Sequence, residues 1–204
     1  MKQTLNLTVG AKAALAFAAP AVATDDVRPF LIGALLGSHN GKLAAVGTDG
    51  HFMAVACAGI AMPTAWADVI LPPAALKAAT HKAAAVLETD GLRVAVIAVD
   101  GTRQEFKAVE GKYPDWYRLL QAQNACDVTT EPMGLNLEFL SRLAKGLKTA
   151  LKLAGKKGVE AAPFMRFHML ASGGYPNSAL LRYETVADDA AAVEFEAVVM
   201  RARV

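Results

Sequence analysis

The same order of structural signals recurs three times along the chain: an extended segment, then a helical pattern, then two or three strand-like segments. The strand-like segments alternate apolar with polar residues, whereas the helical segments space apolar residues by three or four. The three units cover residues 4–56, 68–111 and 133–204. Each predicts a β-α-β-β-β unit, and a repeat of this length constrains the fold more than any single motif does.

A lone unit of this kind leaves a sheet face or edge uncovered, so units are expected to pack in pairs. The first two units form such a pair, and we predict an α+β domain over residues 1–120. Pro114, a polar run and Pro132 then mark a boundary within residues 118–130. Residues 121–204 are predicted to hold the third unit alone. That unit is expected to pair with another chain, which favours a homo-oligomer.

Composition is typical of a globular protein with a large core and many turns, since 54% of the 204 residues are hydrophobic and 16 are Gly. No apolar run approaches the roughly 18 residues that span a bilayer. Cys57 and Cys126 have no CxxC partner and are interpreted as ordinary thiols. These features favour a cytoplasmic protein without membrane contact.

Basic residues are concentrated in one segment, although the net charge is only +2. From Arg142 to Lys157 there are six basic residues and no acidic one. Helical spacing puts four of them on one face, namely Arg142, Lys145, Lys148 and Lys152. The opposite face carries Leu140, Leu143, Leu147, Leu151 and Ala154. Asn136 is expected to cap the start of this helix, and Gly155 is expected to end it.

Two interpretations of this basic face remain open. One is an ordinary solvated helix surface. The other is a surface that contacts nucleic-acid phosphates, to which the first two helical segments would add Lys12, Lys77 and Lys82. Contacts to phosphates are insensitive to sequence and weaken with salt. Duplex DNA is therefore a candidate partner, and these seven basic residues are candidate DNA-facing residues.

The sequence contains few residue patterns that are typical of catalysis. The histidines show no metal-ligand spacing with one another or with the cysteines; they are His39, His51, His81 and His168. The Asp pairs at 25–26 and 188–189 sit in turns, and no phosphate-binding glycine loop is found. We therefore predict no catalytic residue, no metal and no cofactor. The alternative is a small enzyme whose active site follows no recognised pattern.

One polar turn interrupts two strand-like runs in the stretch AVGTDGHFMAVACAG, residues 45–59. Asp49 and Gly50 are typical of a tight hairpin turn, so the turn taken alone requires no functional explanation. Its neighbours change that interpretation, because the stretch is one of five motifs that occur in a recognisable order.

Those five motifs resemble the bacterial DNA polymerase III beta subunit family, the sliding clamps; they are DDVRPFLIGALL, VGTDGHFMAVA, VILPPAALKAA, EGKYPDWYRLL and EAVVMRARV. The first four resemble the middle one of the clamp's three domains. GLNLEFLSRLAKGLKTA and the final motif resemble only the second half of the third domain. The resemblance implies a DNA-clamp fold, with antiparallel sheets outside and helices on one face.

In clamps, the segment that matches TDGH forms one wall of an apolar pocket for the short clamp-binding peptides of polymerases and other replication proteins. Carried over residue by residue, the resemblance implies a pocket made by Leu31, Thr48, Gly50, His51, Met53, Pro114, Arg118, Leu119, Val198 and Met200. Two departures concern this pocket. Phe52 replaces the basic residue that usually follows the histidine, and Arg201 and Ala202 replace a Pro-Met pair. They predict a changed peptide preference or weaker binding.

The function implied by the resemblance is that of a sliding-clamp-like processivity factor in DNA replication. Its partners would be duplex DNA, DNA polymerase and other clamp-motif proteins. Because the family's ring holds twelve units and this chain three, four copies would supply a ring, and an open dimer is the plainer alternative. Another alternative is a peptide-binding decoy or regulator of a replisome that does not encircle DNA.

Overall fold

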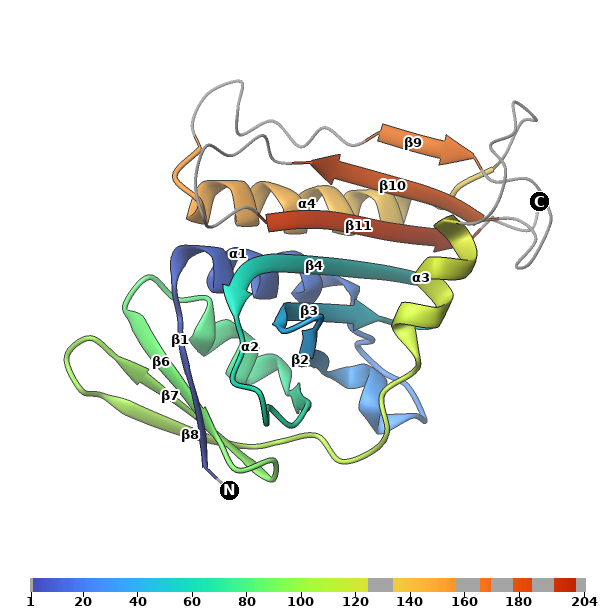
Figure 1. The fold of residues 1–204 in the computed structure, drawn as a ribbon. Helices are drawn as coiled ribbons and strands as arrows, with labels where there is room; N and C mark the ends of the chain where they lie inside the picture. Colours follow the sequence, from blue (N-terminus) through green and yellow to red (C-terminus); the bar gives the residue numbers. More distant parts are fainter. Residues whose placement is uncertain (1, 125–133, 157–165, 170–177, 185–192, 201–204) are drawn as a thin grey trace.

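The computed structural model describes residues 2–124, 134–156, 166–169, 178–184 and 193–200, which are called the described residues below (Figure 1). The predictions for Cys126, Arg201 and Ala202 fall outside these residues. Among the helices of the described residues, none is both long enough and apolar enough to cross a membrane.

The helices and strands follow the predicted order. The first unit comprises β1 (Gln3–Asn6), α1 (Val9–Ala18), the 3₁₀ turns η1 (Ala19–Ala21) and η2 (Pro29–Ile32), β2 (Ala34–His39), β3 (Lys42–Thr48) and β4 (Phe52–Ala61). The second comprises β5 (Val69–Leu71), α2 (Pro73–Ala79), β6 (Ala84–Thr89), β7 (Arg93–Ala98) and β8 (Arg103–Lys107). The third comprises α4 (Leu137–Leu153), β9 (Arg166–Met169), β10 (Ser178–Glu184) and β11 (Val193–Met200). The extended segment expected at the start of the third unit is reduced to a bridge at Leu135.

A further helix, α3 (Trp116–Asn124), overlaps the predicted domain boundary. The carboxylate of Asp115 accepts a hydrogen bond from the amide of Arg118 at 3.1 Å, which satisfies one of the free amides in the first turn of α3. Leu120 is buried and Leu119 is half-buried, so this helix is held by packing. The sequence did not reveal the apolar side of α3, because polar residues surround it.

The strands form two antiparallel sheets, with the orders β1-β6-β7-β8 and β5-β2-β3-β4-β11-β10-β9. The first strand of each of the first two units crosses to the other unit, since β1 pairs with β6 and β5 pairs with β2. Each unit thus completes the sheet of the other. The α+β class predicted from the repeat is confirmed, while the exchange of strands was not predicted.

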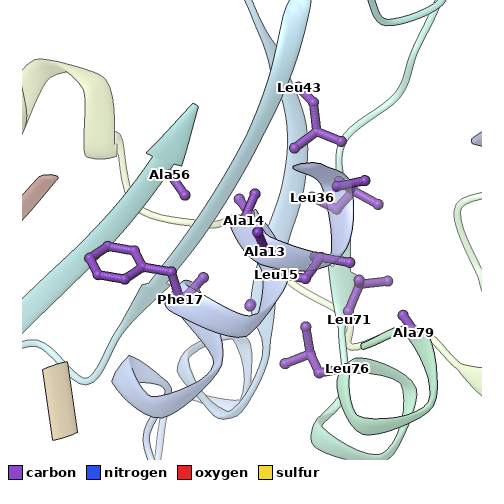
Figure 2. Close-up of a cluster of buried hydrophobic side chains, with 14 of the residues drawn as sticks. Ala13, Ala14, Leu15, Phe17, Leu36, Leu43, Ala56, Leu71, Leu76 and Ala79 are labelled. Carbon is purple, nitrogen blue, oxygen red and sulfur yellow. The ribbon is translucent and has the colours of Figure 1, made fainter. Parts of the chain in front are cut away.

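Helix α1 is buried over nearly its whole surface, with Lys12 half-buried. Its alanines allow close approach to the sheet: a Cβ placed on Gly47 of β3 would lie 2.1 Å from the carbonyl oxygen of Ala18. Figure 2 shows side chains of α1 in the same apolar cluster as residues of β2, β3 and β4 and of α2. The small residues of α1 therefore permit one continuous core between the first two units.

Helix α4 joins this same core. It lies alongside α1 (Figure 1), and Leu143, Leu147 and Leu151 are buried, as the helical spacing predicted. The rings of Phe17 and Phe195 approach with centroids 4.7 Å apart, so β11 contributes to the core as well. Ala154, expected on the apolar face, is instead exposed, because the helix has already ended there.

Both predicted ends of α4 are confirmed. The side chain of Asn136 accepts a hydrogen bond from the amide of Glu138 at 2.9 Å. At the other end Gly155 has φ +77°, and the amides of Gly155 and Lys156 donate to the carbonyls of Lys152 and Leu151. This pair of bonds closes a helix through a left-handed glycine.

Candidate peptide-binding site and basic helix face

The two walls of the predicted pocket are brought together by the pairing of β4 with β11. In that pairing Val198 lies opposite Met53, although the two strands belong to different units. Just beyond the paired strands, the amide of Met200 donates to the carbonyl of His51 at 3.0 Å. The seam between β4 and β11 therefore carries residues from both predicted walls.

The turn at the start of β4 is fixed by its own side chains. The Thr48 hydroxyl donates to the carbonyl of Phe52 at 2.8 Å and accepts from the amide of Gly50 at 3.1 Å. One carboxylate oxygen of Asp49 accepts from the amides of His51 and Phe52, at 2.9 and 3.0 Å. Gly50 has φ +88°, a conformation that glycine adopts without strain. These bonds present His51 to solvent while Phe52 turns into the core.

A second copy of this turn joins β6 to β7. There Thr89 bonds the carbonyl of Arg93 and the amide of Gly91, and Asp90 accepts from the amides of Leu92 and Arg93. Gly91 has φ +91°. The sequence Thr-Asp-Gly at both places is the signal that could have revealed this copy. The turn geometry is thus a property of the repeated unit, and function at the first copy must come from its surroundings.

Beneath the first turn lies an apolar floor. Met53 is 5% exposed and belongs to a cluster with Val46, Leu120 and half-buried Leu119 and Val198. Tyr113 packs against the same cluster and donates its hydroxyl to the carbonyl of Val46 at 3.0 Å. Burial raises the pKa of Tyr113 above its usual range. The floor thus joins β3, β4 and β11 to α3.

The other predicted pocket residues differ in exposure. Gly50, His51, Arg118 and Met200 are exposed, Pro114 is half-buried, and Thr48 is buried. Leu31 is 1% exposed within η2 and is not a member of the Met53 cluster. The contacts described above join seven of the ten predicted residues and do not include Leu31, Pro114 or Arg118.

Arg28 is a rim residue that the predicted set lacked. A Cβ placed on Gly50 would lie 3.0 Å from its guanidinium. Arg28 forms an ion pair with Asp26 at 2.8 Å, and its hydrogen bonds lower the pKa of Asp26 to about 2. The DVRPF motif contained this residue, but the sequence offered no means of placing it beside Gly50.

The predicted basic face is present with one correction. Lys77, Lys82, Lys145, Lys148 and Lys152 are exposed, and half-buried Lys12 donates to the carbonyl of Lys82 at 3.0 Å. Arg142 is different, because its guanidinium bonds Asp49 and the carbonyls of Pro20 and Val22. Helical spacing placed Arg142 with the lysines, yet its side chain turns toward the protein. It is not a free cation of that face.

The chemical groups typical of catalysis are sparse in this region. Burial raises the pKa of the Cys57 thiol to about 11, so it is protonated at neutral pH. Within the described residues, no group of three or more His, Cys, Asp and Glu residues is arranged to hold a metal ion. The seam thus combines an apolar cluster around Met53 with the exposed residues His51 and Met200.

Comparison with known proteins gives a consistent result. No protein-family model matches the chain. The chain is 34% identical over 107 residues to the beta sliding clamp of Pseudomonas aeruginosa, a match that covers 49% of this chain and 29% of that protein. This chain thus matches well under half of the curated relative.

Solved sliding clamps are similar to the chain over its full length. A clamp from Pseudomonas aeruginosa has a TM-score of 0.67 at 19% identity, and the chain covers 67% of it. A clamp from Bartonella birtlesii bound to griselimycin has a TM-score of 0.65 at 18% identity with 66% covered, and one from Caulobacter crescentus has 0.66 at 17% with 65% covered. The DNA-clamp fold is therefore confirmed. The chain is thus similar to bacterial DNA polymerase III beta sliding clamps, in sequence over about half its length and in fold over all of it.

Proposed function

We propose that the chain is a noncatalytic, clamp-like protein of DNA replication that binds clamp-motif peptides at the β4–β11 seam and associates with duplex DNA. The observation that carries the proposal is the pairing of Met53 with Val198. The predicted pocket needs residues from two units, and this pairing joins those units in one sheet. In this proposal residues 1–120 act as a complete clamp-type domain, and residues 121–204 supply half of another.

Peptide binding is supported by the chemistry of the seam. Met53 and Leu119 are flexible apolar side chains that adapt to varied partners, and exposed Met200 extends that surface. His51 and Arg118 add polar groups at the rim. An apolar floor with a few polar rim groups is the usual form of a site for short peptides.

DNA association is supported by the exposed cations of α4. Lys145, Lys148 and Lys152 lie on the side of α4 away from the buried Leu143 and Leu147. Helices α1 and α4 lie side by side, and α2 contacts α1, so the three helices are neighbours and in this proposal their lysines form one basic layer. Such a layer would contact phosphates without reading bases.

A second candidate function is a peptide-binding module that does not encircle DNA. The third unit favours it. Only α3 and residues 125–133 separate the second unit from the segment that begins α4, and that interval is too short to hold a companion for the third unit. One chain therefore contains three of the units that clamps use in pairs.

For the assembly we propose a ring of four copies, in which the third unit of one copy packs against the third unit of another.

Binding to labelled duplex DNA and to a labelled clamp-motif peptide, measured by fluorescence anisotropy over a range of salt concentrations, separates these functions. The clamp-like function predicts peptide binding together with sequence-independent DNA binding that weakens steeply with salt. Peptide binding without DNA binding would favour the decoy or regulator. Loss of both would contradict the proposal and favour the unrecognised enzyme.

A further inference from the structure

We propose that Arg142 of α4 is a positioning residue that holds the turn Thr48–Phe52 as a fixed wall of the peptide site. This inference rests on the proposed peptide-binding function. It concerns a residue that helical spacing had assigned to the DNA-facing surface, and it gives that residue a different role.

The contacts of Arg142 join three separate segments. Its Nη1 lies 2.8 Å from Oδ2 of Asp49 in the turn. Its Nε and Nη2 donate to the carbonyls of Pro20 and Val22, at 2.8 and 2.9 Å, where the chain leaves η1. The side chain of Arg142 is 26% exposed and that of Asp49 is 11% exposed, so the pair is largely screened from water. Half-buried charge pairs with this many hydrogen bonds hold their geometry firmly.

The two oxygens of Asp49 have separate tasks. Oδ1 accepts the amides of His51 and Phe52 and so shapes the turn, whereas Oδ2 binds Arg142. The turn is thereby attached to α4 through the same carboxylate that organises it. A movement of α4 relative to β4 would therefore displace the backbone of His51 through the Asp49 carboxylate.

Aromatic contacts reinforce this attachment. The guanidinium of Arg142 lies 4.7 Å from the centroid of the Phe52 ring. Phe139, one turn earlier on α4, stacks on Phe52 at 5.2 Å and lies parallel to His51 at 6.2 Å. Two residues of α4 therefore hold the turn, one by charge and one by its ring.

The second copy of the turn shows what the first would be without α4. Asp90 makes the same bonds to backbone amides as Asp49 does, but it is exposed, and the bonds it forms among the described residues stay within the turn. Leu92, which corresponds to His51, is 70% exposed. Since the local bonds are the same, the contacts with Arg142 and Phe139 of α4 distinguish the wall at the seam from an ordinary hairpin turn.

Two substitutions break the contact between Asp49 and Arg142 from its two sides. Asp49→Asn keeps one oxygen for the turn amides but places an amide group against Arg142. Arg142→Gln removes the charge and most of the donors. We expect each to weaken binding of the clamp-motif peptide by roughly tenfold, the effect of losing one charge-assisted hydrogen bond. The double variant should be little weaker than either single one, because both remove the same contact.

A second readout needs no peptide. Hydrogen–deuterium exchange is measured for the fragment that contains Thr48–Phe52 and for the one that contains Thr89–Arg93. In both variants we expect faster exchange in the first fragment and no change in the second. Ser141→Ala is the matched control, because it changes an exposed side chain next to Arg142 on the same helix and should change neither readout.

Unchanged exchange in the Thr48–Phe52 fragment, with unchanged peptide affinity, would overturn the inference. If the wild-type chain binds no peptide while the variants still accelerate exchange in that fragment alone, the proposed peptide function fails and the hold of Arg142 on the turn is supported. Thermal unfolding of each variant shows whether it is folded. Should Arg142→Gln prevent folding, Asp49→Asn and Arg142→Lys carry the test, since Lys retains the charge and loses the two carbonyl bonds.

Discussion

At the scale of single residues, Arg142 is held by partners that are distant in the sequence, whereas the residues that end α4 bond to near neighbours. Asn136 and Gly155 end α4 as expected, because capping depends on neighbours in the chain. Arg142 shows the limit: helical spacing indicated a basic face, but the partners that turn its side chain inward come from η1 and from the first turn. Those partners lie 93 to 122 residues away in the sequence.

At Gly146, helix α4 lies close to the backbone of α1. A Cβ placed there would lie 2.9 Å from the carbonyl oxygen of Phe17 and 3.2 Å from Cγ of Pro20. Helix propensity favours Ala over Gly by about 1 kcal/mol, whereas overpacking costs about 1–3 kcal/mol. We predict that Gly146→Ala lowers the free energy of unfolding in urea. The control is Ser141→Ala on the exposed side of α4, which should raise it slightly; a gain from both substitutions would contradict the close approach.

Cys57 is predicted to react slowly. Because burial raises the pKa of its thiol to about 11, the thiolate is scarce at pH 8. In a Cys126→Ser variant, alkylation by iodoacetamide should be on the order of 100-fold slower in the folded than in the urea-unfolded protein. Equal rates would show that Cys57 is not protected.

The same shift has a consequence for stability. A group whose pKa is raised by folding stabilises the folded state below its unfolded pKa, and this contribution is lost as the pH rises through the folded value. The Cys57 contribution should therefore be complete below about pH 9 and disappear toward pH 11. Tyr113, whose pKa is also raised, acts in the same direction. Urea unfolding of the wild type and of Cys57→Ala across this pH range measures the difference.

At the scale of elements, hydrophobic periodicity predicted the existence and order of the three units, and the structure follows that order. The pairing of the strands could not be predicted in the same way. Alternation within β1 and β5 indicated strands, but nothing in either segment specifies that each joins the sheet of the other unit. Helix α3 was missed because it is short and a polar segment follows it.

The exposed lysines of α4 belong to one element and are tested together. We predict that replacing Lys145, Lys148 and Lys152 by Glu abolishes duplex-DNA binding while the unfolding temperature stays close to that of the wild type. Milder replacement by Gln should reduce the slope of log affinity against log salt by roughly 2–3, since each phosphate contact contributes about 0.9. Ser141→Glu, which adds a charge elsewhere on α4, serves as control. Unchanged DNA affinity would remove α4 from the DNA-facing surface.

At the scale of the whole molecule, the third unit decides how far the likeness to clamps extends. It continues the sheet of the first unit through β11, so one side of it is covered. The chain covers about two thirds of the solved clamps, and it lacks a companion unit between α3 and α4. The set of pocket residues remains a prediction, although the β4–β11 pairing that it requires is present.

Association between copies should be measurable in solution. Because the third unit has no companion within the chain, we predict a homo-oligomer, and a ring of four copies would give a mass of about four times 21.4 kDa. Light scattering across a concentration series measures that mass. A monomer at every concentration would exclude the ring and favour the peptide-binding module that does not encircle DNA.

The most direct test of the account is titration of a labelled clamp-motif peptide onto the wild type, His51→Ala and Met200→Ala, with duplex-DNA binding measured on the same samples. Both side chains are exposed at one end of the β4–β11 seam, where the amide of Met200 donates to the carbonyl of His51, so neither substitution should unfold the protein. The account predicts that the wild type binds, that both substitutions weaken peptide binding, and that DNA binding is retained. Equal peptide affinity in all three proteins would contradict the assignment of the site to this seam.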